Sequence, residues 1–172
     1  MATTAVSTNP AWQIRFWIKV SAGLLVMALA LLYVLNNWRV GFSNEAMQSV
    51  GAGWFLVHLE PDYSPAIGTY AVFHVGNGLQ GFRPGTLFVK LVVGGPGALI
   101  HVGVNKTTVN GKVVAGSLDS LSALHLSPNQ VVRTFIVPRN AYFVVGTRPY
   151  SYDSRYWGTV PVGAFVGKAY LL

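Results

Sequence analysis

The chain has 172 residues, of which just over half are apolar and only a tenth are charged, and its formal net charge is +7. This composition is too apolar for a disordered tail, and the length suits one membrane anchor followed by one compact domain. The basic residues are scattered singly and form no stripe, so we expect no nucleic-acid partner. The absence of cysteine excludes disulfides and thiolate metal sites.

An uncharged and largely apolar stretch predicts a transmembrane helix over residues 20–38, because about 20 such residues cross the hydrocarbon core of a bilayer. Arg15 and Lys19 precede the stretch and Arg39 follows it, which favours a cytoplasmic N-terminus. The alternatives are a buried helix and a cleaved secretory signal, although the run is long for a signal and lacks a clean cleavage site. The expected organisation is a cytoplasmic segment 1–19, an anchor 20–38 and an exported domain 39–172.

Beyond the anchor, short apolar runs alternate with turn residues, a pattern typical of strands. Asn110-Gly111 predicts a tight hairpin, the GGPG sequence of residues 94–97 predicts a turn, and residues 117–126 predict a short helix or a loop. The fold class is therefore mainly β, an antiparallel barrel-like domain on one N-terminal transmembrane helix. The expected strands are 54–59, 70–75, 87–93, 98–104, 131–137, 142–145 and 164–171.

Lys90 is the first polar residue that the pattern does not explain, because it lies within the apolar strand 87–93. Alternation places it on the same face as Phe88 and Val92. Such a lysine is either an edge-strand residue that points to solvent or a desolvated amine, whose lowered pKa would suit a general base. The residues alone favour the edge-strand interpretation, because buried lysines are rare.

Asp153 and Arg155 form the second polar group and share a face if their segment is extended. They could pin a loop as an ion pair, but a surface turn with an incidental pair is the simpler interpretation. No metal or cofactor site is expected, because neither metal-ligand spacing nor a phosphate-binding loop is present. The histidines without ligand spacing are His58, His74, His101 and His125.

Three segments, in order, resemble conserved boxes of the type I signal peptidase superfamily. In chain order, residues 68–73 (GTYAVF) are similar to its intervening box, which precedes the lysine box. Residues 89–97 (VKLVVGGPG) are similar to the lysine box, and residues 146–161 (GTRPYSYDSRYWGTVP) to the last box. The resemblance covers most of the chain after the anchor. It implies a membrane-anchored endopeptidase with a Ser–Lys dyad.

In that family the nucleophilic serine precedes a methionine just after the membrane segment. The matching stretch, residues 44–49 (NEAMQS), places Ala46 at the serine position, so the resemblance implies an inactive chain. An engineered Ser-to-Ala change is favoured over a natural pseudo-enzyme, because Lys90 and Ser151 would have no obvious reason to persist in a dead scaffold. Ser43 and Ser49 are alternative nucleophiles, although neither precedes a methionine.

The resemblance also assigns roles around the dyad. Lys90 would be the general base, and Ser151 would orient its amine. Asp153 and Arg155 would hold the loop that carries Ser151. The backbone N–H of Ala46 and the amide of Asn44 would bind the oxyanion. Substrate would bind as an added strand, and its expected contacts are Phe42, Ser43, Phe88 and Val89.

Departures from housekeeping signal peptidases include Thr69, Ala98 and Thr147-Arg148, where those enzymes carry acidic or Asp-Asn residues. These traits resemble the TraF-type peptidases of conjugal transfer, which mature pilin subunits and in some systems cyclise them. The expected partners are the lipid bilayer and a membrane-inserted pilin or secretory precursor, and the expected location is the bacterial inner membrane with the domain in the periplasm. A general signal peptidase and a catalytically dead tethered scaffold are the alternatives.

Overall fold

The computed structural model describes residues 10–42, 49–51, 53–77 and 79–172. The chain divides into two compact units, Met1–Asn37 and Trp38–Leu172. The first unit contains helix α1, Pro10–Asn37, which is long and apolar enough to cross a membrane by its length and composition. The helix therefore begins ten residues before the expected anchor, and it includes both Arg15 and Lys19.

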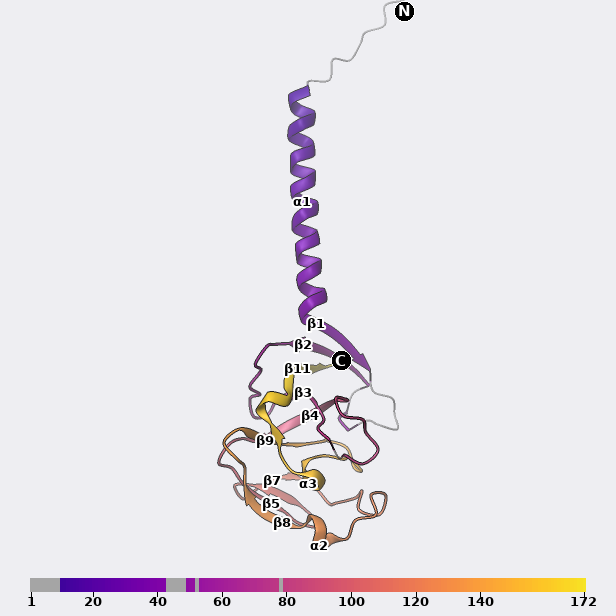
Figure 1. The fold of residues 1–172 in the computed structure, drawn as a ribbon, viewed down its shortest axis with the longest axis vertical. Coiled ribbons are helices and arrows are strands. Elements are labelled where there is room, and N and C mark those ends of the chain that lie inside the picture. Colours follow the sequence, from indigo (N-terminus) through magenta and orange to yellow (C-terminus); the bar gives the residue numbers. More distant parts are fainter. Residues whose placement is uncertain (1–9, 43–48, 52, 78) are drawn as a thin grey trace, which may run out of the picture. The chain divides into compact units, whose positions relative to one another are not determined.

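The second unit is built on a seven-stranded sheet in which every pair of neighbouring strands is antiparallel (Figure 1). The spatial order is β1-β2-β11-β3-β4-β9-β10. The strands are β1 (Trp38–Phe42), β2 (Trp54–Leu59), β3 (Tyr70–His74), β4 (Leu87–Gly94), β9 (Ala141–Val145), β10 (Val160–Pro161) and β11 (Phe165–Leu171).

A second, four-stranded antiparallel sheet has the order β7-β6-β5-β8. Asn110 and Gly111 connect β6 to β7 with positive φ values of 50° and 81°, which the predicted Asn-Gly hairpin requires. The strands of this sheet are β5 (Leu99–Val102), β6 (Thr107–Val109), β7 (Lys112–Ala115) and β8 (Arg133–Ile136).

The polypeptide passes from the large sheet to the small one at residues 94–97, where the sequence predicts a turn. Gly94 ends β4, and a Cβ atom there would lie 3.0 Å from Ile100 and 3.1 Å from Phe143. Gly97 adopts a φ of 81°, and its N–H donates to the carbonyl of Val137. The glycines therefore permit both the close contact of the chain and the sharp change of direction.

The core consists of three clusters of buried apolar side chains. One cluster fills the space between the small sheet and β9, and includes Ile100, Val102 and Phe143. The second lies around Phe73 and Val144, and the third contains Val50, Phe55, Val57, Val72 and Ala169. Val50 shows that the chain just after residue 48 is already anchored in this core.

The expected mainly β, antiparallel fold is confirmed, and each of the seven predicted strand runs overlaps an observed strand. Residues 119–125 form consecutive turns, so the loop alternative for this segment is correct. The sequence did not indicate β1 as a strand, because Trp38 ends the apolar run of the helix. The two-residue strand β10 and the short helices α2 (Pro128–Val131) and α3 (Ser154–Trp157) were also not predicted.

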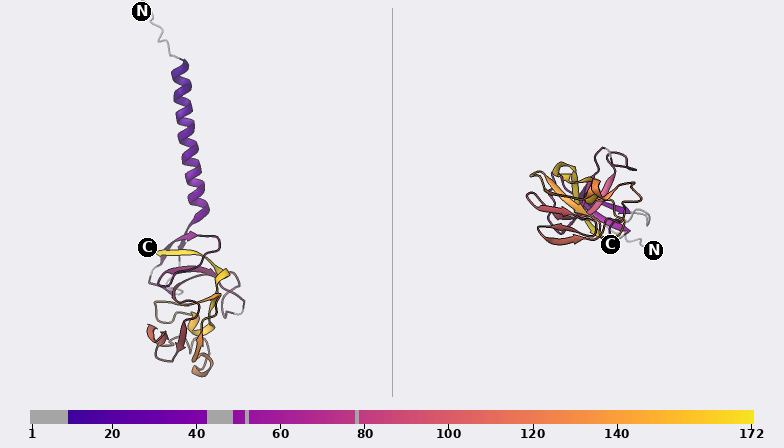
Figure 2. Two further views of the ribbon diagram at one scale, coloured as in Figure 1. Left: turned by 90° about the vertical axis from the view of Figure 1, so that its left-hand side faces the viewer. Right: turned by 90° about the horizontal axis from the view of Figure 1, so that it is seen from below.

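The last strand, β11, lies inside the sheet between β2 and β3. In Figure 2 this yellow strand runs beside strands from the first half of the chain. Its register shifts between Phe165 and Gly167, so a bulge interrupts the pairing with β3. A Cβ atom on Gly167 would overlap the carbonyl oxygen of His58 and lie 3.0 Å from the Cα of Leu59. Only glycine lets β2 approach β11 this closely.

Gly167→Ala is expected to lower the free energy of unfolding by about 3 kcal/mol or more, because the new methyl group meets backbone that cannot move away alone. Gly163→Ala is the matched control, since a Cβ atom there meets nothing within 4 Å. Urea unfolding of the full chain in detergent, followed by tryptophan fluorescence, measures both. Equal stability of the two variants would contradict the close approach of β2 and β11.

Candidate active site

Lys90 lies in the middle of β4 and is buried, with 1% of its surface exposed. β4 lies between β3 and β9, and Lys90 pairs with Ala71 of β3; the lysine side chain is buried even though β9 pairs with β4 only from Leu91 onward. The edge-strand interpretation, in which this lysine points to solvent, is therefore wrong. Alternation along the strand cannot reveal this, because it does not show which strands flank β4.

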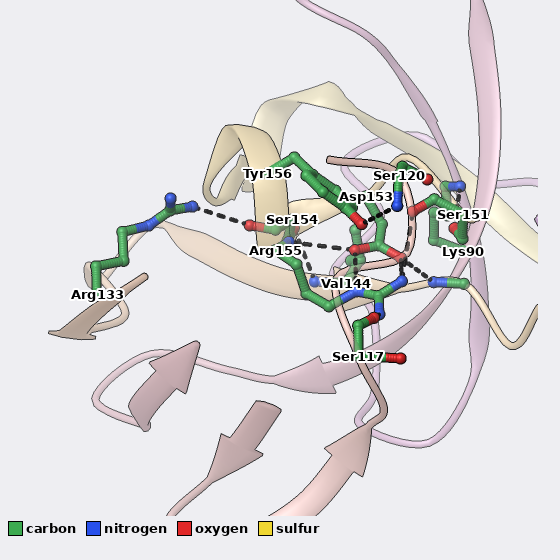
Figure 3. A network of polar contacts seen from close by, with 11 residues as sticks. Lys90, Ser117, Ser120, Arg133, Val144, Ser151, Asp153, Ser154, Arg155 and Tyr156 are labelled. Carbon is green, nitrogen blue, oxygen red and sulfur yellow. Dashed lines mark hydrogen bonds and ion pairs between the residues drawn. The ribbon is translucent and has the colours of Figure 1, made fainter. Parts of the chain in front are cut away.

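The amine of Lys90 donates a hydrogen bond of 3.0 Å to the Oγ atom of Ser151 (Figure 3). The nitrogen of the amine also lies 5.3 Å from the ring centre of Phe88. Burial lowers the pKa of this amine from the ordinary 10.5 to about 8. The carboxylate of Asp153 raises the pKa and the guanidinium of Arg155 lowers it, both by less than burial does. About a tenth of the amine is therefore neutral at pH 7, far more than for an ordinary lysine.

The loop that carries Ser151 is held by a buried ion pair. The carboxylate of Asp153 is fully buried and accepts bonds from Nε and Nη2 of Arg155 at 2.8 Å and 2.9 Å. It also accepts the N–H of Gly146 at 2.8 Å and caps helix α3. The incidental surface pair is therefore the wrong interpretation, and the two side chains meet through a helix cap rather than through an extended segment.

Gly146 brings the chain after residue 48 against the Ser151 loop. A Cβ atom on Gly146 would overlap the side chain of Ser151 and lie 2.5 Å from the carbonyl oxygen of Ser49. That carbonyl oxygen also accepts the N–H groups of Thr147 and Arg148, at 2.8 Å and 3.3 Å. Residue 49 and Ser151 therefore flank the same glycine, and Ser151 bonds to the amine of Lys90.

Further side chains, for which sequence reasoning gave no role, support the loop. The hydroxyl of Ser154 accepts the N–H of Val144, and the carbonyl of Ser154 accepts a bond from Arg133. The hydroxyl of Tyr156 accepts the N–H of Ser120. Ser154 and Tyr156 lie within the segment that resembles the last box, so the resemblance could have indicated that they belong to the site. Arg133 and Ser120 lie outside all three boxes and carry no such signal.

Arg155 also binds two backbone carbonyls, those of Ser117 at 2.8 Å and of Ser151 at 3.3 Å. The guanidinium thus connects the loop of residues 117–126 to the loop that carries Ser151. Figure 3 shows these groups converging around the Asp153 carboxylate. The predicted supporting residues and two of the predicted catalytic residues, Lys90 and Ser151, therefore form one contiguous network.

Other predicted site residues are placed only in part. Phe42 ends β1 and is exposed, with its ring 4.9 Å from that of Trp54. Phe88 and Val89 lie on β4 just before Lys90, and β9 pairs with β4 only from Leu91 onward. The predicted residues Ser43, Asn44 and Ala46 lie outside the described residues.

The described arrangement can hold a neutral amine beside a hydroxyl in a water-poor environment, as general base catalysis requires. Within the described ranges, no group of three or more His, Asp or Glu side chains could hold a metal ion. The groups that the site offers are the amine of Lys90 and the hydroxyl of Ser151, with the buried pair of Asp153 and Arg155 as support.

Comparison with known proteins gives the family. The sequence model of the family "Signal peptidase, peptidase S26" matches residues 14–172. A probable signal peptidase I-2 of Synechocystis is 32% identical over 108 residues, which are 62% of this chain and 47% of the relative. A signal peptidase I of Leptolyngbya laminosa is 30% identical over 116 residues, which are 65% of this chain and 53% of the relative. The chain thus spans about half the length of these relatives.

Among solved structures, a signal peptidase I from Enterococcus faecalis is similar at 24% identity and a TM-score of 0.40, over 62% of this chain and 97% of that one. The match of the family model begins inside helix α1 and ends at Leu172, one residue after β11, and so it includes both Lys90 and Ser151. On this match, the chain belongs to the signal peptidase family, peptidase S26.

Proposed function

We propose that the chain is a membrane-anchored serine/lysine endopeptidase in which Lys90 is the general base. The observation that carries the proposal is the buried amine of Lys90, which bonds to Ser151 and has its pKa lowered to about 8. Family membership supports the same chemistry, because the relatives are named as signal peptidases. Ser151 orients the amine, and Asp153 with Arg155 holds the loop of Ser151.

In the reaction, a serine Oγ attacks the carbonyl carbon of the scissile bond and its proton passes to the neutral amine of Lys90. The carbonyl oxygen becomes an oxyanion, which backbone N–H groups of the nucleophile segment stabilise. The C–N bond then breaks, and the ammonium of Lys90 returns the proton to the leaving amine. Water, activated by the same lysine, releases the acyl group from the serine.

Ser49 is our first candidate for the nucleophile. Its backbone lies against Gly146, next to the hydroxyl that binds Lys90, and Val50 after it is buried in the core. This serine carries the hydroxyl that the reaction needs. With Ser49 as the nucleophile, the chain is active with the sequence it has.

The second candidate is position 46, which the family resemblance indicates and which lies outside the described residues. Under this alternative, Ala46 leaves the chain without its nucleophile, and Asn44 assists the oxyanion in the restored enzyme.

For the substrate, we propose a membrane-inserted pilin precursor of a conjugative system, with a secretory precursor as the alternative. Among the described strands, β9 pairs with β4 only from Leu91 onward, so β4 before Leu91 suits an added substrate strand, and Phe42, Ser43, Phe88 and Val89 are its proposed contacts. Helix α1 would anchor the enzyme in the bacterial inner membrane with the β domain in the periplasm, because Arg15 and Lys19 favour a cytoplasmic N-terminus.

Four variants separate the two nucleophile assignments from a catalytically dead scaffold. With Ser49 as nucleophile, the unchanged chain cleaves precursor, and Ser49→Ala or Lys90→Met lowers the rate at least about 10³-fold. With the nucleophile at position 46, only Ala46→Ser is active, and the combined Ala46→Ser/Lys90→Met variant is inactive. Gel assays with proteoliposomes that contain pilin or secretory precursors measure the rates. Inactivity of every variant on every precursor would support the scaffold and refute the peptidase.

The rate of the active form should rise about tenfold per pH unit up to about pH 8 and then level off, because only the neutral amine of Lys90 accepts a proton. At pH 6 we therefore expect about a hundredth of the maximal rate. Initial rates from pH 5.5 to 9.5 test this. A profile that levels off below pH 6 would be inconsistent with Lys90 as the base.

Unfolding supplies a control that needs no substrate. Between pH 8 and 10.5 the folded chain holds Lys90 neutral while the unfolded chain still protonates it. The unfolded state then binds more protons, so stability should rise with pH across this window. Lys90→Met should lack this part of the rise, which urea unfolding at pH 8 and pH 10 would show.

The mass of the product distinguishes hydrolysis from cyclisation. If a substrate amine rather than water attacks the acyl-enzyme, the product is a ring that is one water lighter than the linear product. Mass spectrometry of a processed pilin precursor should show this lighter ring. A linear product from pilin, together with cleavage of secretory precursors, would favour a general signal peptidase.

A further inference from the structure

The amine of Lys90 stays neutral only if water is kept away from it. The groups nearest to it belong to strand β4 and to the loop that carries Ser151. Phe88 contributes its ring from the same strand, with its centre 5.3 Å from the nitrogen. Tyr152 follows Ser151 directly. Neither side chain is fully buried, although the amine-bearing Lys90 is only 1% exposed, so a further side chain is needed to complete the cover.

Phe82 lies in the segment between β3 and β4, and its ring is in contact with both of these aromatic side chains. It meets Phe88 edge to face at 4.7 Å between ring centres with an interplanar angle of 86°. It stacks on Tyr152 at 6.1 Å and 21°. Phe82 therefore connects the strand of the amine to the loop of the hydroxyl, although none of the three boxes contains it.

The segment that carries Phe82 is fixed to the sheet by its own hydrogen bonds. Val75 and Thr86 bond across its base, and the N–H of Gly85 donates to the carbonyl of Val75. The ring of His74 bonds to the carbonyl of Gly85 at 2.9 Å. The partly buried Phe82 packs against the cluster of Phe73, Val92 and Val144, whereas Tyr152 packs against the neighbouring cluster. This anchoring gives the ring of Phe82 a defined position.

We propose that Phe82 is a positioning residue, which clamps Phe88 and Tyr152 together and so keeps water from the amine of Lys90. Its catalytic consequence rests on the proposed function, whereas its effect on the amine does not. The charged groups that act on Lys90 are Asp153 and Arg155. Among the described residues, the ring of Phe82 instead pairs with the rings of Phe88 and Tyr152. Removal of the ring therefore changes hydration while it leaves the ion pair in place.

Phe82→Ala should admit water beside the amine, and hydration favours the ammonium form. We expect the pKa of Lys90 to rise by at least about one pH unit, and the rate of the active enzyme at pH 7 to fall about tenfold. Activity should recover at pH 9.5, where the amine is neutral again. A merely structural defect would instead lower the rate equally at every pH.

The experiment measures the pKa by NMR on the full chain in micelles with lysine labelled at Cε, and Lys90→Met assigns the signal. Phe82→Leu keeps most of the apolar volume and should raise the pKa of Lys90 by less. It serves as the test variant if Phe82→Ala unfolds. Phe135→Ala is the matched control, because Phe135 lies on β8 of the small sheet, where its ring packs on Phe143. It should leave the pKa unchanged.

A pKa that stays within 0.2 of the parent in a folded Phe82→Leu or Phe82→Ala variant overturns the inference. So does an equal rise in Phe135→Ala. A raised pKa combined with no cleavage by any variant supports Phe82 as the cover of Lys90 and refutes only the peptidase. If the active enzyme cleaves precursor but Phe82→Ala leaves its pH profile unchanged, the peptidase is supported and the role of Phe82 is refuted. The two failures are therefore distinguishable.

Discussion

The buried carboxylate of Asp153 is the group on which the candidate site depends. It binds Arg155 through two atoms, accepts the N–H of Gly146 and begins helix α3. These bonds fold residues 146–155 into a closed loop that places Ser151 against Lys90. A buried ion pair adds little net stability, but loss of one partner leaves a desolvated charge that costs several kcal/mol. The pair therefore specifies the shape of this loop more than it stabilises the domain.

Two opposing effects set the pKa of Lys90. Desolvation by the sheet and the aromatic cover favours the neutral amine, whereas Asp153 favours the ammonium. The guanidinium of Arg155 engages that carboxylate directly, so the negative charge acts on Lys90 only in part. The same ion pair that builds the loop thus also prevents Asp153 from restoring the ordinary lysine pKa. Structure and electrostatics are coupled through one pair of side chains.

Local patterns in the sequence were sufficient for the strands and turns, because β-branched runs, Asn110-Gly111 and the glycines of residues 94–97 act through nearby backbone. They failed where the answer depends on tertiary neighbours. Lys90 looked like an edge residue because alternation does not reveal that its side chain is buried and bonds to Ser151, 61 residues further along the chain. Similarly, Asp153 and Arg155 looked incidental because burial of a loop is not encoded in their spacing. The boxes of the family supplied what periodicity could not, except for Phe82 and Arg133, which lie outside them.

The place of β11 has a consequence for how the domain is assembled. During synthesis β2 and β3 emerge early, yet they do not pair with each other, and the strand that joins them is made after the other described strands. Until Phe165–Leu171 is available, both strands expose backbone groups that a neighbouring chain could pair with. The sheet, which includes the strand that carries Lys90, is therefore completed only after Phe165–Leu171 has been made. A chain interrupted before that strand would present open edges instead of a half-formed enzyme.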